Sequence, residues 1–321
     1  MPVPTLRERF SGAINRVTLG ATAAEGGTRA RTVTLGGDAG LPLLAFEAAL
    51  PHPPALALEV SNAGAGTWPE EVRKQVNAVA QDVGQWAAQC EKWGADLVCL
   101  RLHAAHPDAG TRDADACAED VRRVLDHCGL PLIVWGVDVP EVDNIVLPKC
   151  AQAARGENCL LGTAKEKNYR TLAAACLADG HKVIAESPCD INLAKQVNIL
   201  LQDMGMSLGD IVMYPTTSAL GFGMIYIYSA MERARLAALG GDKLLQQPFL
   251  LNVGEEAARV KEGKASEQEE PRWGPLSVRA PLWETATALG LLEAGGSLFV
   301  LRNPAALALA KQLLARMWPK T

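Results

Sequence analysis

The sequence predicts an α/β fold, a (β/α)8 TIM barrel with an N-terminal β-hairpin extension. Eight short apolar runs recur from residue 55 onward, and amphipathic segments such as residues 113–127, 167–178 and 190–204 lie between them. Several runs are apolar almost throughout, as expected for parallel strands covered on both faces. Eight strands that are each followed by a helix are the number that closes such a barrel. A doubly wound open sheet is the alternative that the alternation leaves open. The eight runs are residues 55–60, 97–102, 132–136, 159–162, 183–186, 211–214, 249–253 and 298–301.

The first 54 residues follow a different pattern. Residues 16–19 and 31–35 alternate polar with β-branched or apolar side chains, and Gly26-Gly27 between them indicates a turn. We therefore divide the chain into an N-terminal hairpin with the loop that leads into the barrel, residues 1–54, and the barrel itself, residues 55–321. Residues 260–274 are charged and poor in apolar side chains, so we expect a solvated loop after the seventh barrel strand.

Composition excludes several classes of partner. The formal net charge is -5, which argues against binding to a nucleic-acid backbone, because such binding needs clustered Lys and Arg. The most apolar stretch, residues 40–60, is interrupted by Glu47, His52 and several prolines, so it cannot cross a membrane. The first residues lack the basic start and apolar core of a signal peptide. We expect a cytoplasmic protein with no nucleic-acid and no membrane partner.

The cysteines do not have the spacing of a metal site. The chain has eight, and no two lie closer than nine residues apart. Iron–sulfur and structural zinc sites usually take at least two thiolates from one tight loop. We therefore predict reduced, buried thiols, and no metal or iron–sulfur cluster bound to this chain alone. His103 and His106 lie three residues apart, but no third ligand is near them in the sequence.

Two segments at the carboxyl ends of predicted strands, where barrels carry their sites, are rich in polar and small residues. The first contains Ser187, Pro188, Asp190 and Asn192, where the fifth strand passes into a helix. Asp190 is placed to cap that helix, while Asn192 and the free N–H groups of the helix could meet a ligand. Other strands end on polar residues as well. These are Glu59, Arg101, His103, Asp138, Thr163, Lys165, Glu255 and Arg302.

The second segment follows the sixth strand. It contains Thr216 and Thr217 and then Gly221, Phe222 and Gly223. Small hydroxyls followed by Gly-x-Gly allow the backbone to approach a large flat ligand closely. The glycines are not a dinucleotide-binding fingerprint, because position 226 is a tyrosine rather than the third glycine. Since the fifth and sixth strands are neighbours, we expect the two segments to lie side by side at the mouth of the barrel.

A set of short strings, in order over most of the chain, resembles one family. That family is the small subunit of the corrinoid iron–sulfur protein, also called the delta subunit of acetyl-CoA decarbonylase/synthase. Each string is weak alone, and their order and spacing together carry the resemblance. The strings are residues 34–38, 41–42, 46–47, 68–69, 94–96, 187–188, 190–192, 195–196, 220–221, 231–233, 235–236, 241–243 and 283–284.

The resemblance implies a barrel that pairs with a large corrinoid iron–sulfur subunit, which holds the cluster and most of the corrinoid pocket. The mouth of this chain's barrel would close over a shared cobalt corrinoid. The complex would carry a methyl group from a methyl-tetrahydropterin or folate methyltransferase to acetyl-CoA synthase, both of them transient partners. The two segments would then be the corrinoid-binding residues, and the chain would hold no catalytic residue and would not catalyse alone.

Two positions depart from the family pattern. Tyr214 stands where the family usually has an aspartate before the proline of the sixth strand, and Ile225 stands in place of a glutamate. Binding by backbone and shape would survive these changes, whereas proton handling by the loop would not. Asp179-Gly180-His181 resembles the start of the motif that supplies a cobalt-ligating histidine in corrinoid proteins. Ile184 replaces the glycine of that motif, and His181 precedes a strand at the bottom of the barrel, so we exclude it as a ligand.

Three other interpretations remain open from the residues. One is a free-standing, pterin-dependent methyltransferase barrel. Another is an aldolase that forms a Schiff base through Lys165, which lies at a strand end. The third is a scaffold that touches no ligand. A carrier subunit would acquire a cobalt chromophore only with its partner, whereas a free-standing enzyme would bind its substrate alone.

Overall fold

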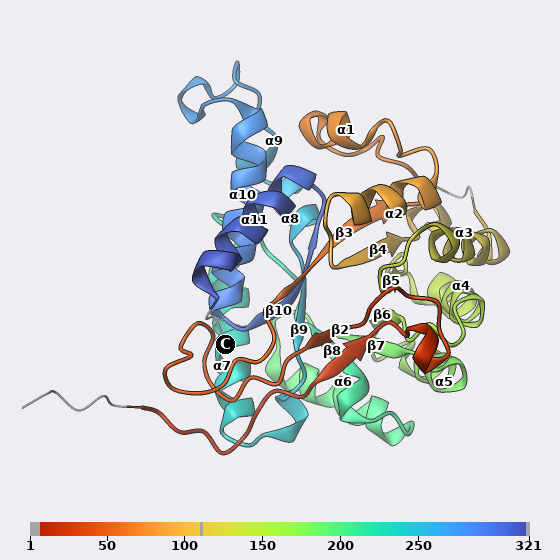
Figure 1. The fold of residues 1–321 in the computed structure, drawn as a ribbon, viewed down its shortest axis with the longest axis vertical. Helices are drawn as coiled ribbons and strands as arrows, with labels where there is room; N and C mark the ends of the chain where they lie inside the picture. Colours follow the sequence, from red (N-terminus) through yellow and green to blue (C-terminus); the bar gives the residue numbers. More distant parts are fainter. Residues whose placement is uncertain (1–6, 110–111, 319–321) are drawn as a thin grey trace, which may run out of the picture.

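Eight parallel strands close into a barrel in the computed structural model, which describes residues 7–109 and 112–318 (Figure 1). The strands follow one another around the barrel in the order β10-β3-β4-β5-β6-β7-β8-β9. All eight predicted strands are present within a few residues of their expected ends, and the TIM-barrel prediction is confirmed. The strands are β3 (Ala55–Ser61), β4 (Leu97–Arg101), β5 (Leu132–Trp135), β6 (Leu160–Ala164), β7 (Lys182–Glu186), β8 (Ile211–Tyr214), β9 (Phe249–Asn252) and β10 (Gly296–Leu301).

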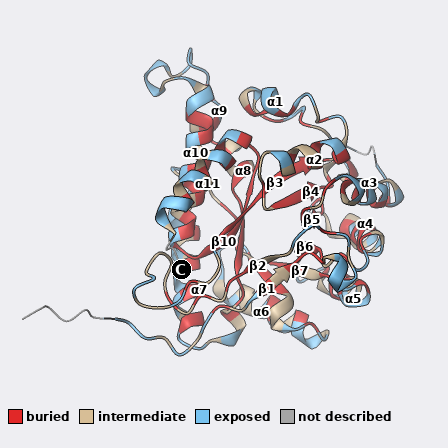
Figure 2. Ribbon diagram, in the orientation of Figure 1, coloured by how far each residue is buried: buried red, intermediate tan, exposed pale blue. Residues whose placement is uncertain are grey.

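Helices cover the outside of the barrel, with buried faces toward the strands and exposed faces toward solvent (Figure 2). In α3, for example, Asp113 caps the first turn, and Cys117, Val121 and Val124 are buried at helical spacing. The helices are α1 (Glu70–Val76), α2 (Val83–Lys92), α3 (Ala114–His127), α4 (Pro140–Ala153), α5 (Tyr169–Asp179), α6 (Ile191–Asp203), α7 (Met224–Leu239), α8 (Val253–Arg259), α9 (Lys261–Lys264), α10 (Leu276–Glu293) and α11 (Pro304–Met317). None of the described helices is long and apolar enough to cross a membrane.

The N-terminal strands form a separate two-stranded sheet across one end of the barrel (Figure 1). Strand β1 (Val17–Leu19) pairs antiparallel with β2 (Val33–Leu35), as the hairpin prediction requires. The connection is longer than a tight turn and contains a 3-10 helix, Ala23–Glu25. Val17, Leu19 and Leu35 are buried and pack in one cluster with the side chains inside the barrel. The sheet therefore closes the end opposite the carboxyl ends of the strands.

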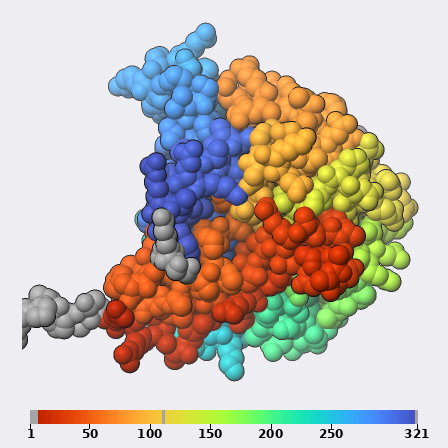
Figure 3. All heavy atoms as spheres, in the orientation of Figure 1, coloured from red at the N-terminus to blue at the C-terminus, as the bar shows by residue number. Residues whose placement is uncertain are grey.

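Residues 260–274 depart from the solvated loop that we expected. This part of the chain contains α9 and a 3-10 helix, Pro271–Trp273, and Gly263 and Ala265 are buried. The cause lies outside the segment. Arg279 of α10 is buried and donates hydrogen bonds to the carbonyl oxygens of Glu262 (2.8 Å), Gly274 (2.9 Å) and Ala265. Figure 3 shows this part, in light blue, standing out beyond the body of the molecule.

All eight cysteines are free thiols, and seven of them are buried as predicted. Cys189 is the exception, because it is exposed on the loop between β7 and α6. Burial raises the pKa of the Cys117 and Cys128 thiols to about 11. These two thiols therefore stay protonated at neutral pH and behave as small apolar side chains.

Candidate functional site

One side of the barrel mouth holds a buried network of ion pairs. Arg302, at the end of β10, donates to both carboxylate oxygens of Glu59 on β3, with distances of 2.9 and 2.8 Å. Its guanidinium lies over the ring of Trp68 at 4.9 Å and within 3.7 Å of Glu255. Arg101, at the end of β4, also contacts Glu255, at 3.4 Å. Bidentate pairing of this kind fixes both side chains in position.

The ionisable groups discussed next, Glu255 and His103, keep one protonation state near neutral pH. Burial alone would raise the pKa of Glu255, but the attraction of Arg101, Arg302 and Arg259 outweighs it and lowers the pKa to about 2. Burial, together with the nearby positive charges of Arg101 and Arg302, outweighs the nearby glutamates and lowers the pKa of His103 to about 4. The imidazole is therefore neutral, and its Nδ1 lies 3.0 Å from the hydroxyl of Ser61.

The opposite side of the mouth is built around Glu186 of β7. Thr163 donates to this carboxylate at 2.6 Å, and Lys165 pairs with it at 3.0 Å and also with Asp138. Burial works to lower the pKa of Lys165, but the two carboxylates outweigh it and the pKa is raised. A Schiff-base lysine needs a neutral amine at working pH. The geometry therefore argues against the aldolase interpretation.

Two aromatic side chains close the interior of the barrel below the mouth. Trp135 of β5 and Tyr214 of β8 meet edge to face, with ring centroids 4.9 Å apart, and Arg101 lies over the Trp135 ring at 4.6 Å. Burial raises the pKa of Tyr214, so the phenol remains protonated. The position at which the family resemblance implied an aspartate thus carries a buried, uncharged side chain.

The two predicted segments lie side by side, as expected. The backbone N–H of Ser187 donates to the carbonyl of Tyr214 at 3.0 Å, and that of Cys189 donates to Pro215 at 3.0 Å. Asp190 caps α6 by accepting from the N–H groups of Asn192 (2.8 Å) and Leu193 (3.1 Å). Its carboxylate therefore occupies two of the N–H groups that the sequence offered to a ligand.

The residues of these segments fall into two groups: buried residues that support the loops, and exposed residues that are free to contact a ligand. Thr217 is buried, and its hydroxyl accepts from the N–H of Asn252 at 2.9 Å, so it supports the loop. Ser187 is buried as well. Thr216 is partly exposed. Of the predicted site residues, the exposed ones are Pro188, Asp190, Asn192, Gly221, Phe222 and Gly223, and Cys189 in the first segment is exposed as well.

The loop that carries Gly221 is anchored to α10. The indole N–H of Trp283 donates to the carbonyl of Leu220 at 3.2 Å, and the N–H of Leu220 donates to Thr287 at 3.2 Å. Gly221 has a φ of +79°, a conformation that side chains other than glycine rarely adopt. The glycine is therefore required by the turn, and the exposed Phe222 follows it directly.

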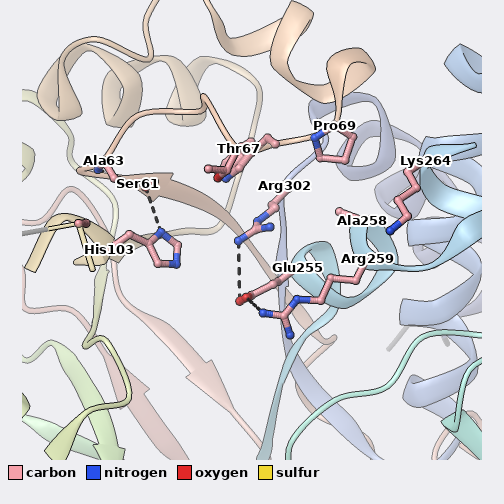
Figure 4. A pocket seen from close by; sticks show the side chains of 12 residues that line it. Ser61, Ala63, Thr67, Pro69, His103, Glu255, Ala258, Arg259, Lys264 and Arg302 are labelled. Atoms are coloured by element: carbon pink, nitrogen blue, oxygen red, sulfur yellow. Dashed lines mark hydrogen bonds and ion pairs between the residues drawn. The ribbon is translucent and has the colours of Figure 1, made fainter. Parts of the chain in front are cut away.

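A cavity of about 570 Å³ lies at the mouth beside the ion-pair network, and the sequence analysis did not find it (Figure 4). Sequence reasoning placed His103, Glu255 and Arg302 at strand ends. It missed Lys264, because it treated residues 260–274 as a solvated loop, and it did not single out Arg259, which precedes that segment. The residues of the lining that matter below are Ser61, Trp68, Glu255, Arg259, Lys264 and Arg302.

A second hollow, of about 770 Å³, is predominantly apolar and lies against α10. Trp273, Val278, Leu282 and Trp283 line it, together with Leu220. Leu220 also lines a neighbouring hollow of about 410 Å³ that contains Phe222, Ile225 and Tyr228. The two hollows therefore adjoin at the loop that holds Gly221.

Glu284 of α10 connects the network to the helix layer, and its titration is testable. The buried carboxylate accepts from the backbone N–H groups of Arg302 (2.7 Å) and Asn303 (3.2 Å), and burial raises its pKa to about 7. The raised pKa means that the folded chain binds this proton more tightly than the unfolded chain. The resulting stabilisation is complete below the ordinary pKa of 4.5 and is lost as the pH rises through 7.

We therefore expect the pH dependence of stability to change in a Glu284→Gln variant, whose amide oxygen can still accept both hydrogen bonds. The free energy of unfolding of the wild type, minus that of the variant, should fall by about 2–3 kcal/mol between roughly pH 5 and 8. Urea denaturation at a series of pH values measures this difference. A difference that does not change with pH would show that Glu284 is already ionised in the folded chain across this range.

Comparisons with known proteins agree with the resemblance seen in the sequence. The family model described as CO dehydrogenase/acetyl-CoA synthase delta subunit matches residues 16–268. The acetyl-CoA decarbonylase/synthase complex subunit delta of Archaeoglobus fulgidus is 37% identical over 96% of this chain and 69% of its own length. The corresponding subunit delta 2 of Methanosarcina acetivorans is 33% identical over 94% of this chain and 70% of its own.

Solved structures show the same fold at much lower identity. A dihydropteroate synthase of Xanthomonas albilineans with 4-aminobenzoic acid has a TM-score of 0.54 at 14% identity, over 87% of this chain and 99% of that one. A dihydropteroate synthase of Coxiella burnetii in complex with pteroic acid has a TM-score of 0.54 at 12% identity, over 86% and 97%. Likeness at this identity supports the barrel alone, whereas the sequence matches cover nearly the whole chain. The chain belongs to the family of CO dehydrogenase/acetyl-CoA synthase delta subunits.

Proposed function

We propose that the chain is the small subunit of a corrinoid methyl carrier in the acetyl-CoA pathway. In this role it helps to move a methyl group from a methyl-tetrahydropterin or folate donor to acetyl-CoA synthase. The single observation that carries the proposal is the juxtaposition of the two segments after β7 and β8 at the mouth of a barrel of this family. When bound, the corrinoid would supply the cobalt that takes up the methyl group and passes it on.

The exposed residues of the two segments suit a broad, flat ligand fringed with amides. Asn192 offers an exposed side-chain amide, and Thr216 offers a partly exposed hydroxyl. Gly221 and Gly223 present backbone without side chains, and Phe222 offers an apolar face with 68% of its surface exposed. The charged residue of the segments, Asp190, is engaged in capping α6. These residues would hold the ligand by shape and hydrogen bonds rather than by charge.

The chain is not expected to catalyse methyl transfer alone. Tyr214 is a buried, protonated phenol, and position 225 is an isoleucine, so the loop after β8 offers no carboxylate at these places for moving a proton. Among the described residues, no three His, Cys, Asp or Glu side chains gather as a metal site. As the family resemblance implies, we assign the iron–sulfur cluster to the partner subunit, and the corrinoid to both subunits together.

The partner would be the large corrinoid iron–sulfur subunit, docked on an apolar surface beside the mouth. We call this the α7–α10 surface, and define it by Phe222, Ile225, Tyr226, Val278 and Leu282. Each of these side chains has between 49% and 74% of its surface exposed. Concentrated apolar exposure of this kind is uncommon on a protein that acts as a monomer and is typical of an interface. A pterin-dependent methyltransferase and acetyl-CoA synthase would then visit the assembled pair, in a cytoplasm that keeps the free thiols reduced.

A matched pair of variants tests this interface. Leu282 on α10 and Leu177 on α5 have nearly equal exposed fractions, 49% and 48%, but only Leu282 belongs to the α7–α10 surface. We expect Leu282→Lys to weaken binding to the large subunit at least tenfold, roughly the effect of burying a charge at an apolar contact. Leu177→Lys should bind as the wild type does. Sizing chromatography and calorimetric titration with the large subunit measure both.

Two results would contradict the proposal at different levels. If the wild-type chain stays a monomer in the presence of the large subunit, the carrier function itself fails. If a complex forms and Leu282→Lys binds like Leu177→Lys, the function stands and the interface lies elsewhere.

A further inference from the structure

The charged cavity lies across the mouth from the segments proposed to meet the corrinoid. It is formed at the ends of β3, β4, β9 and β10, between the start of α1 and the helices α8 and α9 (Figure 4). Three cations line it, Arg259, Lys264 and Arg302, against one carboxylate, Glu255. Behind the lining, Arg101 adds one positive charge and Glu59 and Glu256 add two negative charges, which leaves one positive charge in excess. The lining therefore has an excess of positive charge.

One edge of the Arg302 guanidinium donates no hydrogen bond to the described part of the chain. Its Nε and Nη2 atoms are engaged by Glu59 and Glu255, whereas Nη1 has no hydrogen-bond acceptor among the described residues. The side chain is held rigidly, because only 9% of its surface is exposed and it lies over the Trp68 ring. A fixed guanidinium with free N–H groups is well suited to recognise a carboxylate or phosphate oxygen.

Arg101 shows the same lack of acceptors. Its contacts to His103 and Glu255 are both long, at 3.4 Å, and its Nη1 is buried without a partner in the described part of the chain. A buried donor that is left unsatisfied is costly, so it needs an explanation. A negative charge in the adjacent cavity would lower this cost by attracting both guanidinium groups.

Lys264 supplies a third positively charged group that could attract an anion. It lines the cavity from α9, is exposed, and forms no ion pair among the described residues. Arg259, by contrast, is already shared between Glu255 (2.5 Å) and Glu256 (2.7 Å). The net attraction for an anion therefore comes mainly from Arg302 and Lys264. The hydroxyls of Ser61 and Thr67 add neutral hydrogen-bonding groups on the facing wall.

We propose that this cavity binds a small oxyanion ligand, an organic carboxylate or phosphate, held between Arg302 and Lys264. The volume of about 570 Å³ is that of a small-molecule site, not of a single ion. Trp68 and Pro69 give the remainder of the ligand an apolar wall. The site does not depend on the corrinoid, since the residues of the two sites follow different strands.

The test uses the full chain with inorganic phosphate and with succinate as probes, each titrated by calorimetry at constant ionic strength balanced with chloride. Lys264→Ala should weaken binding about five- to tenfold, because an ion pair made by an exposed side chain contributes less than a buried one. Lys264→Arg should restore it. Lys261→Ala is the matched control, because Lys261 lies on the same short helix but pairs with Glu270 and does not line the cavity. A shift of the Trp68 indole resonance on titration would locate the ligand.

Saturable binding of either probe, weakened by Lys264→Ala and not by Lys261→Ala, supports the site. Preference for phosphate or for succinate then identifies which oxyanion class the natural ligand carries. Absence of saturable binding of both probes overturns the proposal. Equal loss in Lys264→Ala and Lys261→Ala also overturns it, since general surface charge would then explain the binding.

Discussion

Replacing Gly221 by leucine is expected to release the corrinoid from the assembled complex while the barrel stays folded. A leucine at a φ of +79° is strained by about 1–2 kcal/mol, which displaces the loop locally rather than unfolding the chain. Its side chain would also meet Trp283, whose ring lies 3.5 Å from the position of a Cβ atom. Cobalt content and the visible spectrum of the heterodimer measure the loss.

The control for strain is Gly180→Leu. Gly180 has a φ of +78° and no atom within 4 Å of its Cβ position, and it precedes β7 at the far end of the barrel. The Gly180→Leu variant should carry the same backbone strain as Gly221→Leu, but its complex should keep its cobalt. Asn192→Ala should have a smaller effect on corrinoid retention than Gly221→Leu, about 1 kcal/mol for one neutral hydrogen bond. Unchanged cobalt content in Gly221→Leu would remove this loop from the corrinoid site.

Substituting Arg302 by methionine should destabilise the folded chain by about 3–5 kcal/mol, because Glu59 would remain buried without its partner. Glu59 is 1% exposed, and both of its oxygens accept from Arg302. Urea denaturation gives the free energy of unfolding. Lys74→Met is the surface comparison: Lys74 lies in solvent on α1, so the loss of its pairs with Glu70 and Glu71 should change the free energy of unfolding far less.

The double variant Glu59→Leu with Arg302→Met separates pairing from packing. Removing both charges leaves no uncompensated group, so most of the lost stability should return. If the double variant is as unstable as Arg302→Met alone, the loss comes from packing against Trp68 rather than from the stranded carboxylate.

The barrel could be predicted because each strand is recognisable from its own short stretch of sequence. Strand β8 begins and ends at the predicted residues, and its neighbours differ by a few positions, since continuous apolar runs bounded by helical segments mark strands covered on both faces. The capping role of Asp190 was predictable for the same reason, because a cap depends on residues two and three positions away.

The charged half of the mouth could not be predicted in this way. Glu59 and Arg302 are 243 positions apart, and nothing in either neighbourhood indicates the other. The order in residues 260–274 is set by Arg279, which lies after that segment. Thr217 looked free to bind a ligand until the fold placed Asn252 beside it. Each case depends on contacts that exist only after distant strands have come together.

The pairing of β10 with β3 has a consequence for synthesis on the ribosome. The first barrel strand, beginning at Ala55, finds one of its two neighbours only when the residues around Leu298 have been made. Until then its free edge is exposed, and Val17, Leu19 and Leu35 lack the Leu298 and Val300 side chains with which they share a cluster. Non-local closure of this kind is slow and leaves nascent chains open to aggregation. Chaperones that act on nascent or newly released chains would therefore have the longest access to the amino-terminal sheet, the part that is translated first.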